Sequence, residues 1–237
     1  MKRRITYLGR VFLSLVLLLA AGCSKNETMV PDSPSYEWGS DKAGNILKED
    51  LLAVATLRSE EGVRYLQLDP VSVGYVVNTE AVSDIPDGTR LFVQYKAYWA
   101  DEKPSFCTES VWVDWVSPLD VGTVGPTDRP SDPVDIVNDW ITSLEDGFLT
   151  LHYTIHSSGK AKHGFILSRT EDPTRFVLVH DAKGETDGSL TDGIVCFPVD
   201  GLLPDADNGG ATVTLSLTYL NLKNTLTTLT VDYRTTP

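Results

Sequence analysis

From about residue 50 onward, apolar side chains recur at every second position, a period typical of half-buried β-strands. Five segments of the first half show it: 51–57, 65–68, 74–77, 91–99 and 111–115. A Pro-Asp-Gly turn at 86–88 precedes the long fourth segment. Five short strands so close together predict a small closed antiparallel barrel of the OB type.

A proline-rich segment separates these strands from a second group. Residues 125–133 contain three prolines, which cannot continue a central strand, so this segment is the predicted linker. Seven further strands are predicted at 134–141, 148–155, 163–168, 176–180, 193–199, 211–220 and 225–233. Their spacing favours an antiparallel β-sandwich. We therefore predict an all-β chain with an OB-like barrel over 48–124, a linker over 125–133 and a β-sandwich over 134–237.

The N-terminus indicates export and lipid attachment. Basic side chains at positions 2, 3, 4 and 10 precede an apolar run over 11–21, the pattern of a secretory signal peptide over 1–22. At about 1.5 Å per residue, this run would span only half a bilayer core, which is too little for a transmembrane helix. The run ends in Leu19-Ala20-Ala21-Gly22-Cys23, which resembles a bacterial lipobox whose cysteine receives a diacylglycerol. An ordinary cleaved signal is the alternative.

Lipidated Cys23 would hold the mature chain on a membrane of the cell envelope, and we expect the outer membrane. Polar residues and prolines over 23–47 predict a tether. In some bacteria a short acidic run after the lipidated cysteine directs export to the cell surface, but here Glu27 is alone until Asp32. The sequence therefore leaves both the periplasmic and the surface face open.

The charge of the chain excludes one class of partner. Twenty basic against 33 acidic side chains give a formal net charge of −13, and removal of residues 1–22 would make it −17. Nucleic-acid binding depends on Lys and Arg side chains that displace counterions from phosphates, so we expect no nucleic acid as a partner. A neutral sugar, a cation or another envelope protein is compatible with such a surface.

The sequence lacks the familiar catalytic spacings. It contains no HExxH, CxxC, GxSxG or Walker-type loop. Ser157-Ser158-Gly159-Lys160 matches S-x-x-K, but it falls between two predicted strands and is interpreted as a turn. With Cys23 assigned to the lipid, Cys107 and Cys196 fall in different predicted domains, so we expect buried free thiols rather than a disulfide. We expect no catalytic residues, no cofactor and no enzymatic activity.

The histidines do not predict a zinc site, which needs at least three convergent ligands. If 148–155 and 163–168 form a hairpin, apolar parity places His163 on the core side and His152 and His156 on the other face, about 13 Å apart. Two acidic loops are weak calcium candidates. They contain Asp181, Glu185, Asp187 and Asp192 in one loop, and Asp205, Asp207 and Asn208 in the other. Neither keeps EF-hand spacing, so solvated turns are the preferred interpretation and no metal is expected.

Aromatic residues of the barrel suggest a speculative ligand-binding surface. Trp99 and Trp115 share the parity of the apolar core positions and are predicted to be buried. Phe92, Tyr98 and Trp112 have the opposite parity on neighbouring strands, where an exposed face could stack on a sugar. The preferred alternative is that the tether, the linker or the sandwich covers these three rings.

Local motifs extend over nearly the whole mature chain. The segments are 87–93 (DGTRLFV) in the barrel, and 139–141 (DWI), 148–153 (FLTLHY), 162–167 (KHGFIL), 177–181 (VLVHD) and 193–199 (GIVCFPV) in the sandwich. Together with the lipobox and the strand order, they resemble the NigD-like family of Bacteroidetes lipoproteins. The resemblance implies an N-terminal OB-like domain, a C-terminal β-sandwich and an envelope location. It implies no particular activity and no catalytic residues.

Two functions fit these features. The first is a lipid-anchored, non-catalytic binding or accessory protein whose ligand is a neutral glycan or a protein. The alternative is a structural or immunity-type envelope protein that acts through a protein partner.

The lipobox generates a direct prediction. Replacement of Cys23 by Ser removes the acylation site, and each methylene of a buried acyl chain contributes about 0.8 kcal/mol to membrane binding. The Cys23→Ser protein should therefore move from the membrane fraction to the soluble fraction while it stays folded. A variant that stays with the membrane would contradict the lipid anchor.

Overall fold

The computed structural model describes residues 39–40, 46–69, 71–98, 103–185, 187–203 and 212–234. The predicted signal peptide, Cys23, Trp99 and the acidic residues of 205–208 lie outside these ranges. Within them, the structure contains no helix with the length and apolar character needed to cross a lipid bilayer.

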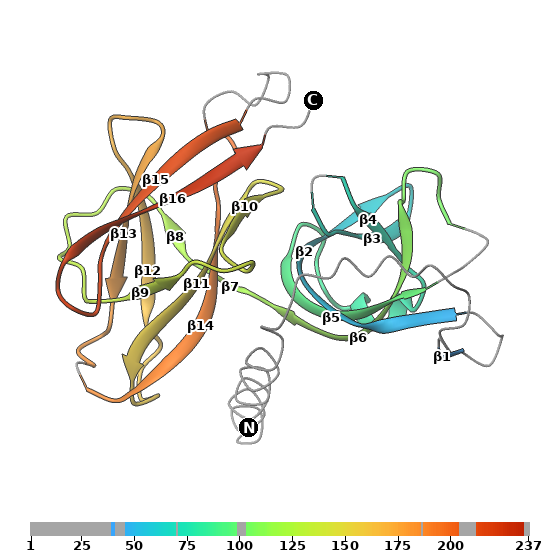
Figure 1. The fold of residues 1–237 in the computed structure, drawn as a ribbon, viewed down its shortest axis with the longest axis horizontal. Helices are drawn as coiled ribbons and strands as arrows, with labels where there is room; N and C mark the ends of the chain where they lie inside the picture. Colours follow the sequence, from blue (N-terminus) through green and yellow to red (C-terminus); the bar gives the residue numbers. More distant parts are fainter. Residues whose placement is uncertain are drawn as a thin grey trace, which may run out of the picture. The chain divides into compact units, whose positions relative to one another are not determined.

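The first half of the described chain is a closed barrel. Its strands are β1 (Gly39–Ser40), β2 (Ile46–Glu60), β3 (Val63–Gln67), β4 (Val73–Val76), β5 (Arg90–Tyr98) and β6 (Glu109–Pro118). They follow the order β1-β2-β3-β4-β6-β5, and β5 pairs back with β2 to close the barrel (Figure 1). A 3-10 turn, η1 (Thr79–Val82), places Val82 in the barrel core. The OB-type barrel is thus confirmed, although β4 and β6 pair in parallel.

A β-bulge in β6 makes one core prediction wrong. Gln94 pairs with Trp115 and Tyr95 pairs with Val113, so Asp114 is an extra residue without an opposite partner in β5. The inward-facing parity of β6 therefore changes after Val113, and Val116 packs against the barrel core instead of Trp115. Trp115, predicted to be buried, is 38% exposed.

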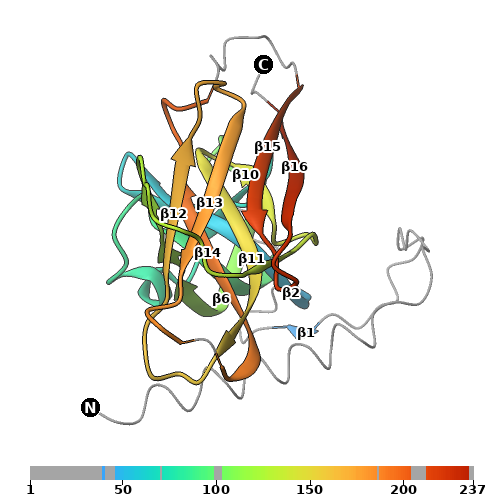
Figure 2. The same cartoon turned by 90° about the vertical axis from the view of Figure 1, so that its left-hand side faces the viewer.

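The second half is a two-layered β-sandwich. Its strands are β7 (Asp120–Val121), β8 (Thr123–Val124), β9 (Asp135–Val137), β10 (Ser143–Glu145), β11 (Phe148–Ser157), β12 (Gly164–Arg169), β13 (Arg175–Asp181), β14 (Ser189–Pro198), β15 (Thr212–Leu220) and β16 (Leu226–Arg234). One sheet has the order β10-β11-β14-β7, with β9 also paired to β11. The other has the order β16-β15-β13-β12-β8, and Figure 2 shows its first four strands. Side chains of both sheets, including Phe176 and Phe197, form its core.

The sandwich begins earlier than the sequence predicted. Residues 120–124, assigned to the barrel, form β7 and β8, which pair in parallel with β14 and β12. The predicted linker 125–133 lies along the sandwich, because the Asp132 amide donates to the His180 carbonyl oxygen at 2.8 Å. The domain boundary is therefore the short step from β6 to β7. The single strand predicted at 134–141 is two strands, β9 and β10.

The predicted hairpin of β11 with β12 is also wrong. β11 pairs with β14, while β12 pairs with β13 in the opposite sheet. The loop 158–163 therefore crosses from one layer to the other. Apolar parity identified which side chains face the core, but both layers face the same core, so parity could not assign the sheet.

A buried arginine connects barrel and sandwich. The Arg90 guanidinium, at the start of β5, donates to Thr56 Oγ1 of the barrel at 3.0 Å and to Thr150 Oγ1 of the sandwich at 3.4 Å. It also pairs with the Glu145 carboxylate at 3.3 Å. A buried charge is costly without such partners, so Arg90 links the conformations of the two domains.

Gly122 lets the chain step from β7 in one sheet to β8 in the other. A Cβ at this position would lie 2.1 Å from the ring of Phe197, a fully buried side chain that has no room to move. We expect Gly122→Ala to lower the free energy of unfolding by about 1–3 kcal/mol, as overpacked cores do. Chemical denaturation measures this. Gly125→Ala is the matched control, since a Cβ at position 125 would meet no atom within 4 Å. Equal stability of the two variants would contradict the packing argument.

Candidate functional site

A groove of about 460 Å³ lies at the edge of the sandwich, beside the β7–β8 segment. Residues of both sheets line it: Tyr153, Ile155, Phe165 and Val195 on its apolar part, and Asp120, Thr123, Ser157, Lys162, His163, Thr191 and Asp192 on its polar part. The volume falls in the range of small-molecule sites, about 300–1,000 Å³. This groove is the candidate functional site.

Two aromatic rings meet in the groove. The Tyr153 ring lies opposite Gly193 of β14, where a Cβ would approach it to 2.4 Å, so the glycine makes room for the ring. Across the sandwich, the Tyr153 and Phe165 ring centroids are 4.4 Å apart. Burial, with a smaller effect of the Asp120 charge, raises the pKa of Tyr153 to about 12. The phenol is therefore a neutral donor at neutral pH, and its hydroxyl makes no hydrogen bond to another described residue.

The charges of the groove are balanced within the protein. Lys162 Nζ lies 2.7 Å from Asp120 Oδ1, and both side chains are largely exposed. Asp192 Oδ1 accepts a hydrogen bond from Thr154 Oγ1 at 2.7 Å. The groove therefore combines aromatic faces with hydroxyl and carboxylate oxygens, and its acidic groups already have partners.

One residue of the groove, His163, belongs to a chain of hydrogen-bonded polar groups. His163, which lines the groove, has Nδ1 2.8 Å from His180 Nε2 and Nε2 2.9 Å from Glu185 Oε2. His180 Nδ1 in turn lies 2.9 Å from the carbonyl oxygen of Pro133. The sequence correctly placed His163 toward the core, and its side chain is 4% exposed.

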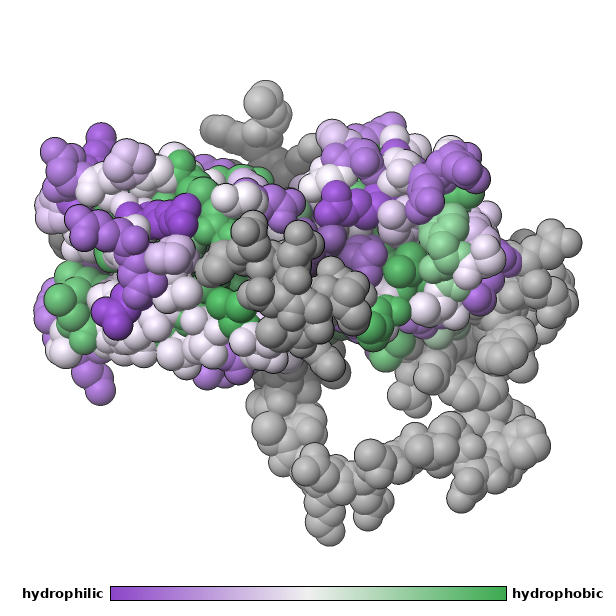
Figure 3. All heavy atoms as spheres, turned by 90° about the horizontal axis from the view of Figure 1, so that it is seen from above, coloured by the Kyte–Doolittle hydropathy of each residue, from purple (hydrophilic) through white to green (hydrophobic). Residues whose placement is uncertain are grey.

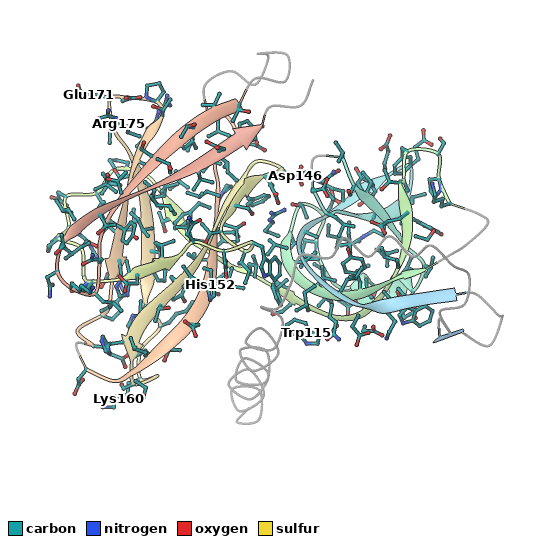
Figure 4. All side chains as sticks on the ribbon, viewed as in Figure 1. Trp115, Asp146, His152, Lys160, Glu171 and Arg175 are labelled. Carbon is teal, nitrogen blue, oxygen red and sulfur yellow. The ribbon has the colours of Figure 1, made fainter. Side chains whose placement is uncertain are left out.

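Glu185 holds the loop between β11 and β12. Its carboxylate accepts hydrogen bonds from the hydroxyls of Ser157 and Ser158 and from the amides of Ser158, Lys160 and Ala161. These donors, with His163 as the largest contribution, hold the pKa of Glu185 well below its usual range. Lys160 marks this loop at one end of the sandwich, opposite the end with Glu171 and Arg175 (Figure 4).

This arrangement is not that of a serine nucleophile. In a catalytic triad the imidazole lies between the hydroxyl and the carboxylate, so that it can accept the hydroxyl proton. Here the Glu185 carboxylate lies between Ser157 and His163, and Ser157 Oγ donates to it at 3.0 Å. The S-x-x-K segment is a loop between two strands, as its interpretation as a turn predicted. Its hydrogen bonds to the Glu185 carboxylate were not predicted.

Other protein groups contact three of the four acidic side chains in the first of the two loops named as calcium candidates. Asp181 pairs with Arg129 and Lys183, each below 3 Å. Glu185 holds its loop, and Asp192 accepts from Thr154. Among the described residues, which include Asp187, no group of three His, Cys, Asp or Glu side chains is arranged to hold a metal ion.

One of the three rings of the predicted aromatic surface, Phe92, lies in a contact between the barrel and the sandwich. Phe92 is buried and stacks against Trp140 of the sandwich, with centroids 6.0 Å apart, while Trp115 meets it edge-on. The preferred alternative, cover by the sandwich, is thus confirmed for Phe92. Trp112 is exposed, and Tyr98 is described only by its position opposite Ser110. On the face in Figure 3, apolar side chains lie in separate patches among polar ones.

Two site features escaped sequence reasoning. Asp139 caps the turn after β9 through the amides of Ile141 and Thr142, and its other oxygen lies 2.8 Å from His152 Nδ1. This turn presents Trp140 to Phe92. The pairing of Glu185 with His163 was missed because the two residues are far apart in sequence. Cys107 and Cys196 are buried free thiols, as expected, and burial raises the pKa of Cys196 to about 11.

Residues 125–233 match the family model of the NigD-like C-terminal beta sandwich domain. This range contains strands β9 to β15 and nearly all of β16. No curated protein matches the chain.

Several solved structures with the same fold come from Bacteroides and Parabacteroides species. A candidate toxin-related protein of Parabacteroides distasonis is 22% identical, with a TM-score of 0.65 over 79% of this chain and 94% of that chain. A NigD-like immunity protein of Bacteroides caccae is 21% identical, with a TM-score of 0.56 over 78% of this chain and 97% of that chain. A candidate lipoprotein of Bacteroides fragilis is 11% identical, with a TM-score of 0.52 over 80% of this chain and 100% of that chain. At these identities the likeness concerns the fold.

The depressed pKa of Glu185 predicts acid sensitivity. The pKa of Glu185 in the folded chain lies below its value of about 4.3 in the unfolded chain. The contribution of ionised Glu185 to stability is therefore present above that pH and is lost as pH falls. We expect Glu185→Gln to be less stable than the native chain at pH 7, with a shallower loss of stability from about pH 5 to pH 2. Denaturation at several pH values measures this. Glu171→Gln, at an exposed site at the other end of the sandwich, should keep the native profile. A Glu185→Gln profile parallel to the native one would contradict the assignment.

Proposed function

We propose that this chain, whose residues 125–233 are a NigD-like C-terminal β-sandwich domain, is a cell-envelope protein that binds a ligand in its groove and catalyses no reaction. The lipobox at Cys23 supports a lipid anchor, and the fold is shared with a candidate lipoprotein of Bacteroides fragilis. We further propose the outer membrane as its location, with either the periplasmic or the surface face.

The observation that carries a binding function is the Tyr153 side chain in the groove. Its ring packs against Phe165, and its neutral hydroxyl is left without a hydrogen-bond partner among the described residues. A groove with aromatic faces and a few polar groups is the usual form of a small-molecule site.

The proposed ligand is a neutral glycan. Sugar rings place C–H faces on aromatic rings and hydroxyls on donors and acceptors, and the groove offers both through Tyr153, Thr123 and Asp192. The internal pairing of Lys162 with Asp120 leaves no unpaired cation there to attract an anionic ligand. The position of Glu185 between Ser157 and His163 supports the absence of acyl-transfer chemistry.

A second candidate is an immunity-type protein that acts through a protein partner. It is favoured by the shared fold with the NigD-like immunity protein of Bacteroides caccae. Affinity purification from envelope membranes distinguishes the two. Stoichiometric recovery of one envelope or secreted protein, together with no glycan binding, would favour this candidate.

Glycan arrays followed by calorimetry test the first function. Tyr153→Phe removes only the hydroxyl, so we expect affinity for a bound neutral glycan to fall about fivefold, which corresponds to about 1 kcal/mol for one hydrogen bond. His156→Gln changes an exposed side chain outside the groove and should bind normally. Unchanged binding by Tyr153→Phe with loss in Trp112→Ala would move the site to the barrel, and hydrolysis of a glycan would contradict a non-catalytic role.

A further inference from the structure

The hydrogen-bond chain that includes His163 has an acceptor at each terminus. At one end lies the carbonyl oxygen of Pro133, and at the other lies the carboxylate of Glu185. Between them, the imidazoles of His180 and His163 contact each other through one nitrogen each. The chain therefore contains three short contacts, all between 2.8 and 2.9 Å.

These three contacts require three protons. The Pro133 oxygen only accepts, so His180 Nδ1 must carry a proton, and the contact between the rings needs another. The contact of His163 Nε2 with an ionised carboxylate oxygen needs a third, because two lone pairs would otherwise face each other. Two neutral imidazoles supply only two N–H groups. One group in the chain must therefore hold an additional proton.

The surroundings place this proton on His163. The Glu185 carboxylate has five donors from the loop besides His163, and these favour its ionised form. His180 is 1% exposed and stacks on the Phe165 ring, and this burial lowers the pKa of His180. His163 contacts the carboxylate directly, so the positive charge is best compensated there.

We infer that His163 is a buried imidazolium at neutral pH, and that its ion pair with Glu185 holds the groove wall in place as long as this proton is bound. The wall consists of Ser157, Ala161, His163 and Gly164, which line the groove. Five hydrogen bonds from the loop 157–161 end on the same carboxylate. The position of this loop thus depends on a carboxylate whose own position depends on a proton.

The other charged groups near the pair support this assignment. Asp132, from the segment before β9, favours a positive charge on the imidazole pair, and its Oδ2 accepts from the Ala182 amide at 2.8 Å. Along the groove, Asp120 pairs with Lys162, Asp192 accepts from Thr154, and the Tyr153 phenol is neutral. Lys183 lies beside Gly164, the neighbour of His163, and pairs with Asp181 at 2.6 Å. Among the groups around the imidazole pair, Asp132 and Glu185 therefore favour a cation.

Loss of the proton has a defined consequence. Neutral His163 that still donates to His180 presents a bare Nε2 to the Glu185 oxygen 2.9 Å away. This repulsion favours movement of the carboxylate, which removes the acceptor of the Ser158, Lys160 and Ala161 amides. The effect on ligand affinity rests on the proposed function, whereas the protonation and the loop coupling do not.

Nitrogen NMR of the full chain, selectively labelled at the histidine rings, tests the protonation without any ligand. At pH 7 we expect both ring nitrogens of His163 to carry protons and His180 to be the neutral Nδ1–H tautomer. In Glu185→Gln, the amide N–H can donate to His163 Nε2, so His163 should become neutral at the same pH. A neutral His163 in the native chain at pH 7 would overturn the inference.

Hydrogen exchange, corrected for the intrinsic pH dependence, tests the loop coupling in the same samples. Protection of the Ser158, Lys160 and Ala161 amides should fall about ten- to hundredfold as pH rises and the additional proton of the chain is lost, as expected for loss of a charge-assisted hydrogen bond. In Glu185→Gln their protection should be lower at pH 7 and should not follow pH. His156→Gln should behave like the native chain. Protection that stays constant across the pH series would overturn the coupling, and a failure to bind glycans would leave both measurements unaffected.

Discussion

The sandwich depends on the close passage of Gly122 over the ring of Phe197. Only a residue without a side chain can lie at this point, because a Cβ would come within 2.1 Å of the ring. The passage allows two adjacent short strands to pair with different sheets, β7 with β14 and β8 with β12. Residues 120–123 of this segment also line the groove between the layers. The strand pairing at this edge of the sandwich and the groove beside it thus both depend on the absence of a side chain at Gly122.

The charged side chains of the groove region and of the domain contact have hydrogen-bonding partners within the protein. The chain is strongly acidic, yet the carboxylates of the groove region, Asp120, Glu185 and Asp192, each accept from a nearby cation or hydroxyl. Arg90 shows the same rule in the interior, where Glu145 and two threonine hydroxyls surround a guanidinium. A groove whose charges are already satisfied is suited to select a ligand by shape and hydroxyl contacts rather than by net charge.

Alternation along the sequence predicted most strands and the inward face of each, because burial repeats every second residue. It failed at Trp115, because one extra residue in β6 reverses which side chains face the barrel core. It also failed to assign β11 and β12 to different sheets, because the inward side chains of both sheets face the same core. Short strands such as β7 have no alternation to detect. The contact of Glu185 with His163 depends on the fold, although the amide-rich Ser-Ser-Gly loop was a usable sign of an anion-binding turn.

The early position of β7 and β8 in the sandwich sequence affects how the domain can form as the chain emerges N-terminus first. Both strands precede the rest of the sandwich, but their partners β14 and β12 follow much later, and β13 must also wait for β15. Such non-local pairings slow folding and leave unpaired edges exposed in the meantime. The barrel closes with partners that all precede β7 in the chain, so we expect the barrel to be complete while the sandwich is still unfinished.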